Sequence, residues 1–62
     1  MTRKEITSRI KKLKKGNSFT VTTRSERTMA TTEGGAMKRF GIIDFDVRTF
    51  AQRDGTFAVI AV

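Results

Sequence analysis

The apolar residues near the start of the chain recur at the spacing of one helical face, with basic and polar residues between them. This i, i+4, i+7 stripe consists of Ile6, Ile10 and Leu13. Thr2 and Glu5 have the spacing of a capping box, in which a hydroxyl and a carboxylate each bond a free backbone N–H. Gly16 suits the left-handed residue that commonly follows a helix. The pattern predicts an amphipathic helix over residues 2–15.

The next segment has the alternation of a β-strand. Phe19 and Val21 would face one side of a sheet, and Thr20 and Thr22 would face the other. β-branched and aromatic residues dominate this segment, as they do in strands. Residues 18–23 are therefore predicted to form a strand with one buried face.

A second helix is predicted over residues 25–40. Thr23 and Glu26 repeat the capping-box spacing just before it. The apolar residues that would share one side of this helix are Met29, Ala30, Ala36, Met37 and Phe40. Because Thr32 and Glu33 interrupt that side, the periodicity is weaker than in the first helix.

Two adjacent glycines lie inside the second predicted helix. Gly34 and Gly35 each cost about 1 kcal/mol relative to alanine in a helix, so the sequence leaves open whether the helix is continuous or kinks or breaks at this pair. A glycine pair can let a phosphate approach the backbone closely, but a packing or hinge role is the preferred interpretation. Gly41 would end the helix.

Residues 42–62 have the pattern of a β-hairpin. Apolar and polar side chains alternate along its first half, with Ile43, Phe45 and Val47 against Asp44, Asp46 and Arg48. Asp54-Gly55 is a strong turn signal between the two strand-like runs. A two-residue turn would place Phe50 opposite Val59, whereas a bulged turn would shift the register by one residue and exchange the faces.

The last predicted strand, residues 56–62, is apolar on both faces. These two faces carry Phe57, Val59 and Ala61 on one side and Ala58, Ile60 and Val62 on the other. A strand in a sheet that is covered on one side does not need apolar residues on both faces. Either both faces of the sheet are therefore covered or one face forms a subunit interface. The order helix, strand, helix, strand, strand predicts an α+β fold, a three-stranded sheet with two helices packed on it.

Positive charge is concentrated at the start of this single small basic domain of residues 1–62. The net charge is +7, from 13 Lys and Arg against 6 Asp and Glu. Seven of the basic residues lie within residues 1–15, together with a single acidic residue. Such asymmetry indicates a polyanionic partner, which is a nucleic acid, an anionic membrane surface or an acidic protein face.

The composition excludes several chemistries. The chain has no cysteine and no histidine, which excludes disulfides, thiolate or histidine metal sites and histidine-based catalysis. Asp44 and Asp46 would share one strand face, but a divalent cation needs more oxygen ligands than are evident. No apolar run is long enough to span a membrane, and no signal peptide is visible. We expect no enzyme, no cofactor, no membrane partner and a cytoplasmic location.

The predicted partner is a nucleic acid, with DNA favoured over RNA. The candidate phosphate-binding residues are Arg9, Lys11, Lys12, Lys14, Lys15, Arg24, Arg27, Lys38 and Arg39. The hairpin adds Arg48 and Arg53. If both helices lie on the same side, their charges would form one patch, although a merely solvated face is the alternative interpretation of the first helix. The five phenylalanines would supply nearly all of the aromatic core, so base stacking is not expected.

Three stretches of the chain resemble small accessory proteins of tailed bacteriophages. In those proteins a G-x-S-F-x-V strand precedes an R…A-x-x-x-G helix and a short hairpin. The corresponding stretches here are residues 13–21, 24–41 and 54–59. The glycine pair in the second helix and the two-faced last strand depart from the usual pattern. The resemblance implies a bacterial host cytoplasm and an accessory role, and such proteins range from DNA binders to inhibitors of host enzymes.

Two functions follow as predictions. The first is a nucleic-acid-binding regulatory or accessory protein, for example in transcription regulation, that contacts phosphates through the basic first helix. The second is an inhibitor or modulator of a host enzyme or defence complex, docking on an acidic surface during host takeover. The concentration of charge favours the first function. The two-faced last strand favours the second, or a homodimer through that strand that serves the first.

Overall fold

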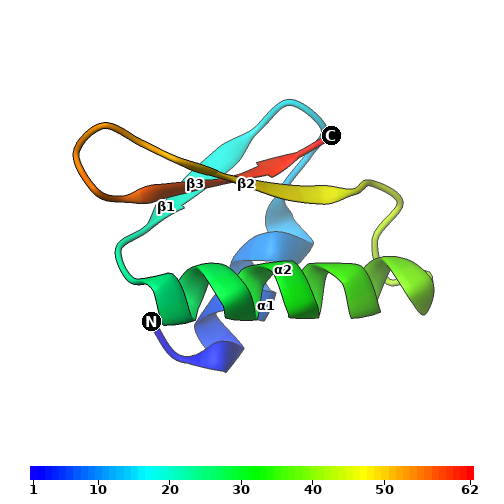
Figure 1. The fold of residues 1–62 in the computed structure, drawn as a ribbon. Coiled ribbons are helices and arrows are strands. Elements are labelled where there is room, and N and C mark those ends of the chain that lie inside the picture. Colours follow the sequence, from blue (N-terminus) through cyan, green and yellow to red (C-terminus); the bar gives the residue numbers. More distant parts are fainter.

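A computed structural model describes residues 1–62 as two helices and a three-stranded antiparallel sheet. The elements follow the order α1 (Arg3–Lys12), β1 (Ser18–Val21), α2 (Arg24–Arg39), β2 (Val47–Ala51) and β3 (Phe57–Ala61). The last strand is central, so the sheet order is β1-β3-β2. Both helices lie on one side of the sheet, and no element covers the other side (Figure 1). The predicted α+β fold and its element order are confirmed.

The first helix begins as predicted but ends three residues early. Thr2 Oγ1 accepts the Glu5 N–H over 3.2 Å, and the Glu5 carboxylate accepts the Thr2 N–H over 3.0 Å, which completes the capping box. The helix ends at Lys12 because Leu13 has an extended backbone, with ψ 151°. Neither α1 nor α2 has the length and apolar character that a membrane crossing requires.

A tight turn between α1 and β1 accounts for the early helix end. The Asn17 N–H donates to the Lys14 carbonyl over 2.9 Å, and Gly16 has φ +91°, as the third position of such a turn requires. The Gly16 N–H donates to the Ala61 carbonyl, and the Ala61 N–H donates to the Asn17 carbonyl, so two residues oppose one. This glycine β-bulge fixes β1 beside β3. Lys14 and Lys15 thus lie in the turn, and their predicted place on the helix is wrong.

The second helix runs without a break through its glycine pair. Thr23 and Glu26 form the predicted capping box at its start, with the Glu26 N–H 3.1 Å from Thr23 Oγ1. A Cβ atom at Gly34 would lie only 2.6 Å from the Cβ of Val47, whereas one at Gly35 would meet nothing within 4 Å. Gly34 therefore allows α2 to approach β2 closely. The helix is therefore continuous through the glycine pair, a point that the sequence left open, and the packing role is confirmed for Gly34 alone.

The segment between α2 and β2 is a loop, although its burial alternates as in a strand. Gly41 ends the helix as predicted, with φ +75°. Ile43 and Phe45 are buried, yet β2 begins only at Val47. Asp46 exchanges two backbone hydrogen bonds with Val62, but residues 42–45 do not pair with β3, so the predicted strand is too long at its start.

The β2–β3 hairpin has the shifted register of a bulged turn. Phe50 pairs with Ala58, so the register predicted for a two-residue turn is wrong. The Gln52 N–H donates to the Thr56 carbonyl over 2.8 Å, and the Gly55 N–H donates to the Gln52 carbonyl over 3.1 Å. Gly55, with φ +86°, supplies the bulge. The shift of one residue moves Phe50 from the helix side of the sheet to the uncovered side.

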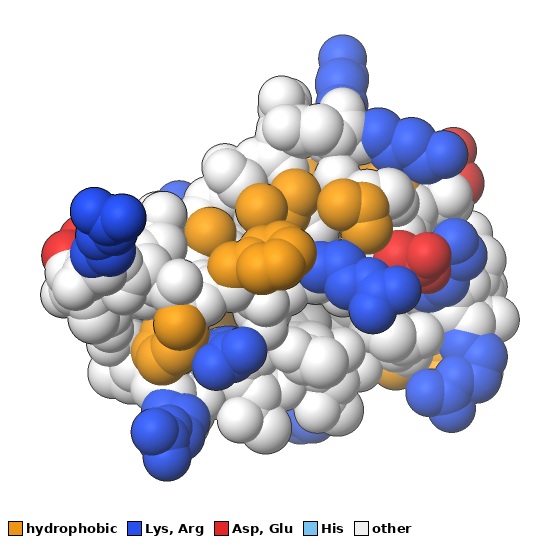
Figure 2. All heavy atoms as spheres, turned by 45° about the horizontal axis from the view of Figure 1, so that its top comes forward, with side chains coloured by type: hydrophobic (Ala, Val, Ile, Leu, Met, Phe, Trp, Pro, Cys, Tyr) orange, Lys and Arg blue, Asp and Glu red, His pale blue; other side chains and the backbone are white.

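The core lies between the helices and the sheet. Its buried residues are Ile6, Ile10, Val21, Ala30, Met37, Ile43, Phe45, Val59 and Ala61. Phe45 is the only phenylalanine among them, and Phe19 and Phe57 pack against the cluster half-buried. Phe40 and Phe50 are 77% and 53% exposed, so the prediction that the five phenylalanines form the aromatic core is wrong for these two. Hydrophobic side chains consequently remain visible on the uncovered side of the sheet (Figure 2).

The carboxylate of Glu26 fastens the start of the chain to α2. It accepts hydrogen bonds from the Thr22 and Thr23 N–H groups, at 3.0 and 3.2 Å, and forms an ion pair with the Met1 ammonium. These contacts, chiefly that with the ammonium, lower the pKa of Glu26 to about 2. The hydrogen bond between the Met1 ammonium and the Glu26 carboxylate raises the pKa of the ammonium.

Glu26→Gln is expected to destabilise the fold at neutral pH and to have a much smaller effect in acid. A carboxyl whose folded pKa is about 2 contributes stability above its unfolded value of 4.5, and that contribution is lost as the pH falls from 4.5 through 2. Urea unfolding of both proteins at a series of pH values measures this difference. A difference in unfolding free energy that stays constant from pH 7 to pH 2 would contradict the ion-pair role.

Candidate nucleic-acid interface

Contacts within the chain hold most of the acidic side chains, whereas most of the basic ones have no acidic partner. The engaged carboxylates belong to Glu5, Glu26, Glu33, Asp46 and Asp54. Hydrogen bonds from Thr2 lower the pKa of Glu5, and those from Thr56 lower the pKa of Asp54. Of the 13 Lys and Arg side chains, only Arg3 and Lys38 form salt bridges. Most of the positive charge is therefore not neutralised within the chain.

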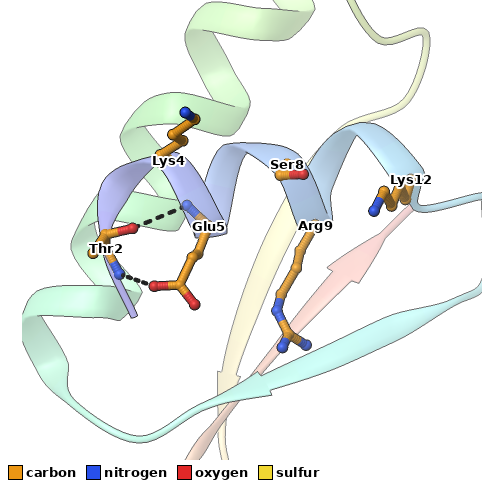
Figure 3. Close-up of a pocket in the computed structure, with 6 residues that line it drawn as sticks. All are labelled: Thr2, Lys4, Glu5, Ser8, Arg9 and Lys12. Atoms are coloured by element: carbon orange, nitrogen blue, oxygen red, sulfur yellow. Dashed lines mark hydrogen bonds between the residues drawn. The ribbon is translucent and has the colours of Figure 1, made fainter.

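A hollow of about 590 Å³ on the outer side of α1 gathers three basic side chains. Its walls contain no apolar residue and consist of Thr2, Lys4, Glu5, Ser8, Arg9 and Lys12. In Figure 3 Glu5 and Arg9 extend from the same side of the helix, while Lys4, Ser8 and Lys12 follow one another along it. The i, i+4, i+8 spacing of these three residues could have added Lys4 and Ser8 to the predicted site.

The start of α2 contributes one unengaged arginine and one that is held by the sheet. A second hollow, of about 390 Å³, is lined by Arg24, Arg27, Thr28, Thr31 and Thr32. Arg27 Nε donates to Thr49 Oγ1 over 3.0 Å, and its guanidinium carbon lies 4.9 Å from the centre of the Phe57 ring. Arg27 therefore packs α2 against the sheet, and Arg24 is the residue here that remains available to a ligand.

The end of α2 likewise carries one basic side chain that is paired within the chain and one that is not. Lys38 Nζ lies 3.2 Å from the Asp46 carboxylate, so this predicted phosphate ligand is paired within the chain. Arg39 is the last residue of the helix and is exposed. Arg24 and Arg39 are about 22 Å apart along the helix, at a rise of about 1.5 Å per residue.

The nine predicted site residues thus form three groups. The first is continuous in the chain along α1 and the following turn, and comprises Arg9, Lys11, Lys12, Lys14 and Lys15. The other two groups lie at opposite ends of α2. Both helices are on the same side of the sheet (Figure 1), but α2 extends the basic surface only at two separate points. The largest concentration of unpaired charge is on α1 and its turn.

The two aspartates considered as metal ligands lie in the loop before β2. Asp44 and Asp46 are both exposed, and Asp46 is paired with Lys38. No group of three or more aspartate or glutamate side chains comes together that could hold a metal ion.

The fold and this basic surface define a small basic α+β protein with one open sheet face. Comparison with known proteins adds no family to that description. The chain matches no protein-family model, and neither a curated protein nor a solved structure shows a significant match. The resemblance to small accessory proteins of tailed bacteriophages stays a prediction that rests on the sequence motifs.

Proposed function

We propose that the protein is a nucleic-acid-binding accessory protein that contacts the phosphate backbone of DNA through α1 and the turn after it. The main support is the charge balance at this place. Six basic side chains lie here without an acidic partner, namely Lys4, Arg9, Lys11, Lys12, Lys14 and Lys15. A binding role without catalysis, in the cytoplasm of a bacterial host, is part of the proposal.

The chemistry of this surface favours phosphate contacts over base recognition. Five of the six side chains are lysines, whose ammonium groups are mobile point charges without the planar geometry that reads base edges. Neutralising phosphates releases counterions, which gives strong binding at low salt and little sequence preference. The protein is expected to bind many DNA sequences with similar affinity.

Fluorescence anisotropy with a short labelled duplex DNA tests the proposal. Binding should be micromolar or tighter at about 50 mM salt and should weaken about a thousandfold at about 200 mM, as about six phosphate contacts require. Absence of binding at the lower salt concentration would overturn the proposal. The alternative function, docking on an acidic surface of a host enzyme or defence complex, would then be examined by capture from a nuclease-treated bacterial lysate.

A further inference from the structure

The side of the sheet opposite the helices carries an apolar centre with a polar and basic border. Strand pairing arranges its outward side chains in two rows, Ser18, Ile60 and Arg48 in one and Thr20, Ala58 and Phe50 in the other. Val62 continues the apolar centre beyond the end of β3. Figure 2 shows hydrophobic side chains gathered in the middle of this face, with Lys or Arg side chains and an Asp or Glu side chain next to them.

Phe50 is the prominent member of this face. Phe50 is 53% exposed although it lies within β2 and pairs with the buried Ala58 of β3. Val62 is 49% exposed, and Ile60 is half-buried between them. A single exposed apolar residue needs no explanation, but a contiguous apolar patch in a small protein commonly marks a binding surface.

The border of the patch matches a negatively charged ligand. Arg48 lies two residues from Phe50 on β2, which places the two side chains on the same face about 7 Å apart. Ser18 and Thr20 supply hydroxyl groups from β1. The outward positions within the three strands carry no acidic residue. Asp46, which pairs with Val62 just beyond the strand ends, is the acidic residue at this border, and Lys38 forms a salt bridge with it. An aromatic ring beside a guanidinium and two hydroxyls suits a nucleotide, whose base stacks while its phosphate pairs with the cation.

We propose that this sheet face binds unpaired nucleotides, with a base stacked on Phe50 and the backbone phosphate held by Arg48. The inference rests on the proposed nucleic-acid function and specifies its substrate class. A base in a duplex is stacked between its neighbours and cannot lie on a protein ring, so the contact requires a single strand. The protein then binds single-stranded regions more tightly than duplex of the same length.

Charge is the reason to prefer a nucleic acid over a second copy of the chain as the occupant. Two chains that each carry +7 repel one another, and a face-to-face dimer would bring the two Arg48 side chains to the same interface. A standard interface also buries about 800 Å² per partner. The apolar centre of this face has only four side chains, two of which, Ala58 and Ile60, are already buried or half-buried.

A tryptophan probe at position 50 tests the contact directly. The chain contains no tryptophan or tyrosine, so Phe50→Trp introduces the only indole of the protein. Phe40→Trp is the matched control, because Phe40 is 77% exposed at the end of α2 and lies outside the sheet. Titration with a twelve-residue oligothymidylate should quench the fluorescence at position 50 by base stacking and leave that at position 40 unchanged. Equal quenching at both positions, or none at position 50, would overturn the inference.

Phe50→Ala measures the energetic importance of the same contact. Its affinity for the oligothymidylate should fall about tenfold to a hundredfold, because one stacked base is lost, whereas its affinity for duplex DNA and its salt slope should stay unchanged. Phe40→Ala should leave both affinities unchanged. Circular dichroism and size-exclusion chromatography verify that the variants are folded and have the oligomeric state of the parent protein.

The outcomes separate this inference from the function on which it rests. In one outcome, the protein binds duplex DNA in a salt-dependent way and Phe50→Ala leaves the affinity for single strands unchanged. In another, Phe50→Ala lowers the affinities for single strands and for duplex DNA equally. Either result overturns the stacking contact and retains the basic surface of α1. Failure of the parent protein to bind any oligonucleotide overturns both. A parent dimer that dissociates on Phe50→Ala would assign the face to a second copy of the chain and overturn the inference.

Discussion

Gly34→Ala is expected to destabilise the fold by about 2 kcal/mol, although alanine is the better helix former. The added Cβ would lie 2.6 Å from both Cβ and Cγ2 of Val47. Because the Cβ of Val47 is fixed to the strand backbone, the contact can be relieved only if β2 moves away from α2. Overpacking costs about 1–3 kcal/mol, and a contact this short with an atom fixed to the strand belongs at the upper end of that range. Subtracting the gain of about 1 kcal/mol in helix propensity leaves a net loss of about 2 kcal/mol.

Gly35→Ala is the matched control, because it is the same substitution at the adjacent position of the same helix. A Cβ at Gly35 meets nothing within 4 Å, so only the propensity gain of about 1 kcal/mol remains. For a domain of this size the melting temperature should rise by about 4–8 °C, whereas Gly34→Ala should lower it by about 10 °C. Thermal and urea unfolding measure both effects. Shifts of the same sign in the two variants would show that α2 does not approach β2 as described.

Reversal of three charges on α1 and its turn is expected to abolish DNA binding. The variant combines Lys11→Glu, Lys12→Glu and Lys15→Glu, all of which are exposed and outside any salt bridge. Half of the six proposed phosphate contacts are lost, and the new carboxylates repel the remaining phosphates. Each lost contact also reduces the salt slope by about 1. Anisotropy titration at several salt concentrations measures the affinity and the slope together.

A variant of equal net charge distinguishes the α1 surface from the total charge of the protein. Arg24→Glu, Arg39→Glu and Arg53→Glu remove the same amount of charge from the two ends of α2 and from the hairpin loop. If α1 carries the interface, this control should retain most of the affinity for duplex DNA. Equal loss in both variants would instead attribute binding to the net charge, and the site assigned to α1 would be wrong.

Local chemistry predicted the elements because each signal involves residues only a few positions apart. The capping boxes begin at Thr2 and Thr23 in the structure as they do in the sequence, since an N-cap depends on a hydroxyl and a carboxylate three residues later. The alternation of Phe19 and Val21 with threonines likewise survived, because period 2 is a property of the strand itself. The element order and fold class followed from these signals.

Features that depend on a distant part of the chain were either predicted wrongly or left open by the sequence. The end of α1 is decided by the bulge at Gly16, which exists only because β1 pairs with β3 at Ala61. The hairpin register depends on the bulge at Gly55, and Asp54-Gly55 fits both loop lengths. The continuity of α2 follows from the close approach to Val47, which compensates for a helix glycine through packing.

The basic residues could be found from the sequence, but the sequence could not show which of them have partners within the folded chain. The distribution of charge along the sequence located the basic residues at the start of the chain, and the composition excluded histidine and cysteine chemistry. The structure showed that Arg27 and Lys38 are engaged with Thr49 and Asp46, because residues far apart in sequence meet across α2 and β2. It also brought Lys4 into the same hollow as Arg9.

The sequence by itself determined the two helices, the strands and the concentration of positive charge near the start of the chain, since propensity, periodicity and charge are properties of local segments. The tertiary structure alone decided which face β2 presents to the helices, because a register shift of one residue turns every side chain of a strand to the other side. Phe50 shows the consequence. The same residue would belong to the core in one register, and in the observed register it lies exposed on the open face, where it can contact a ligand.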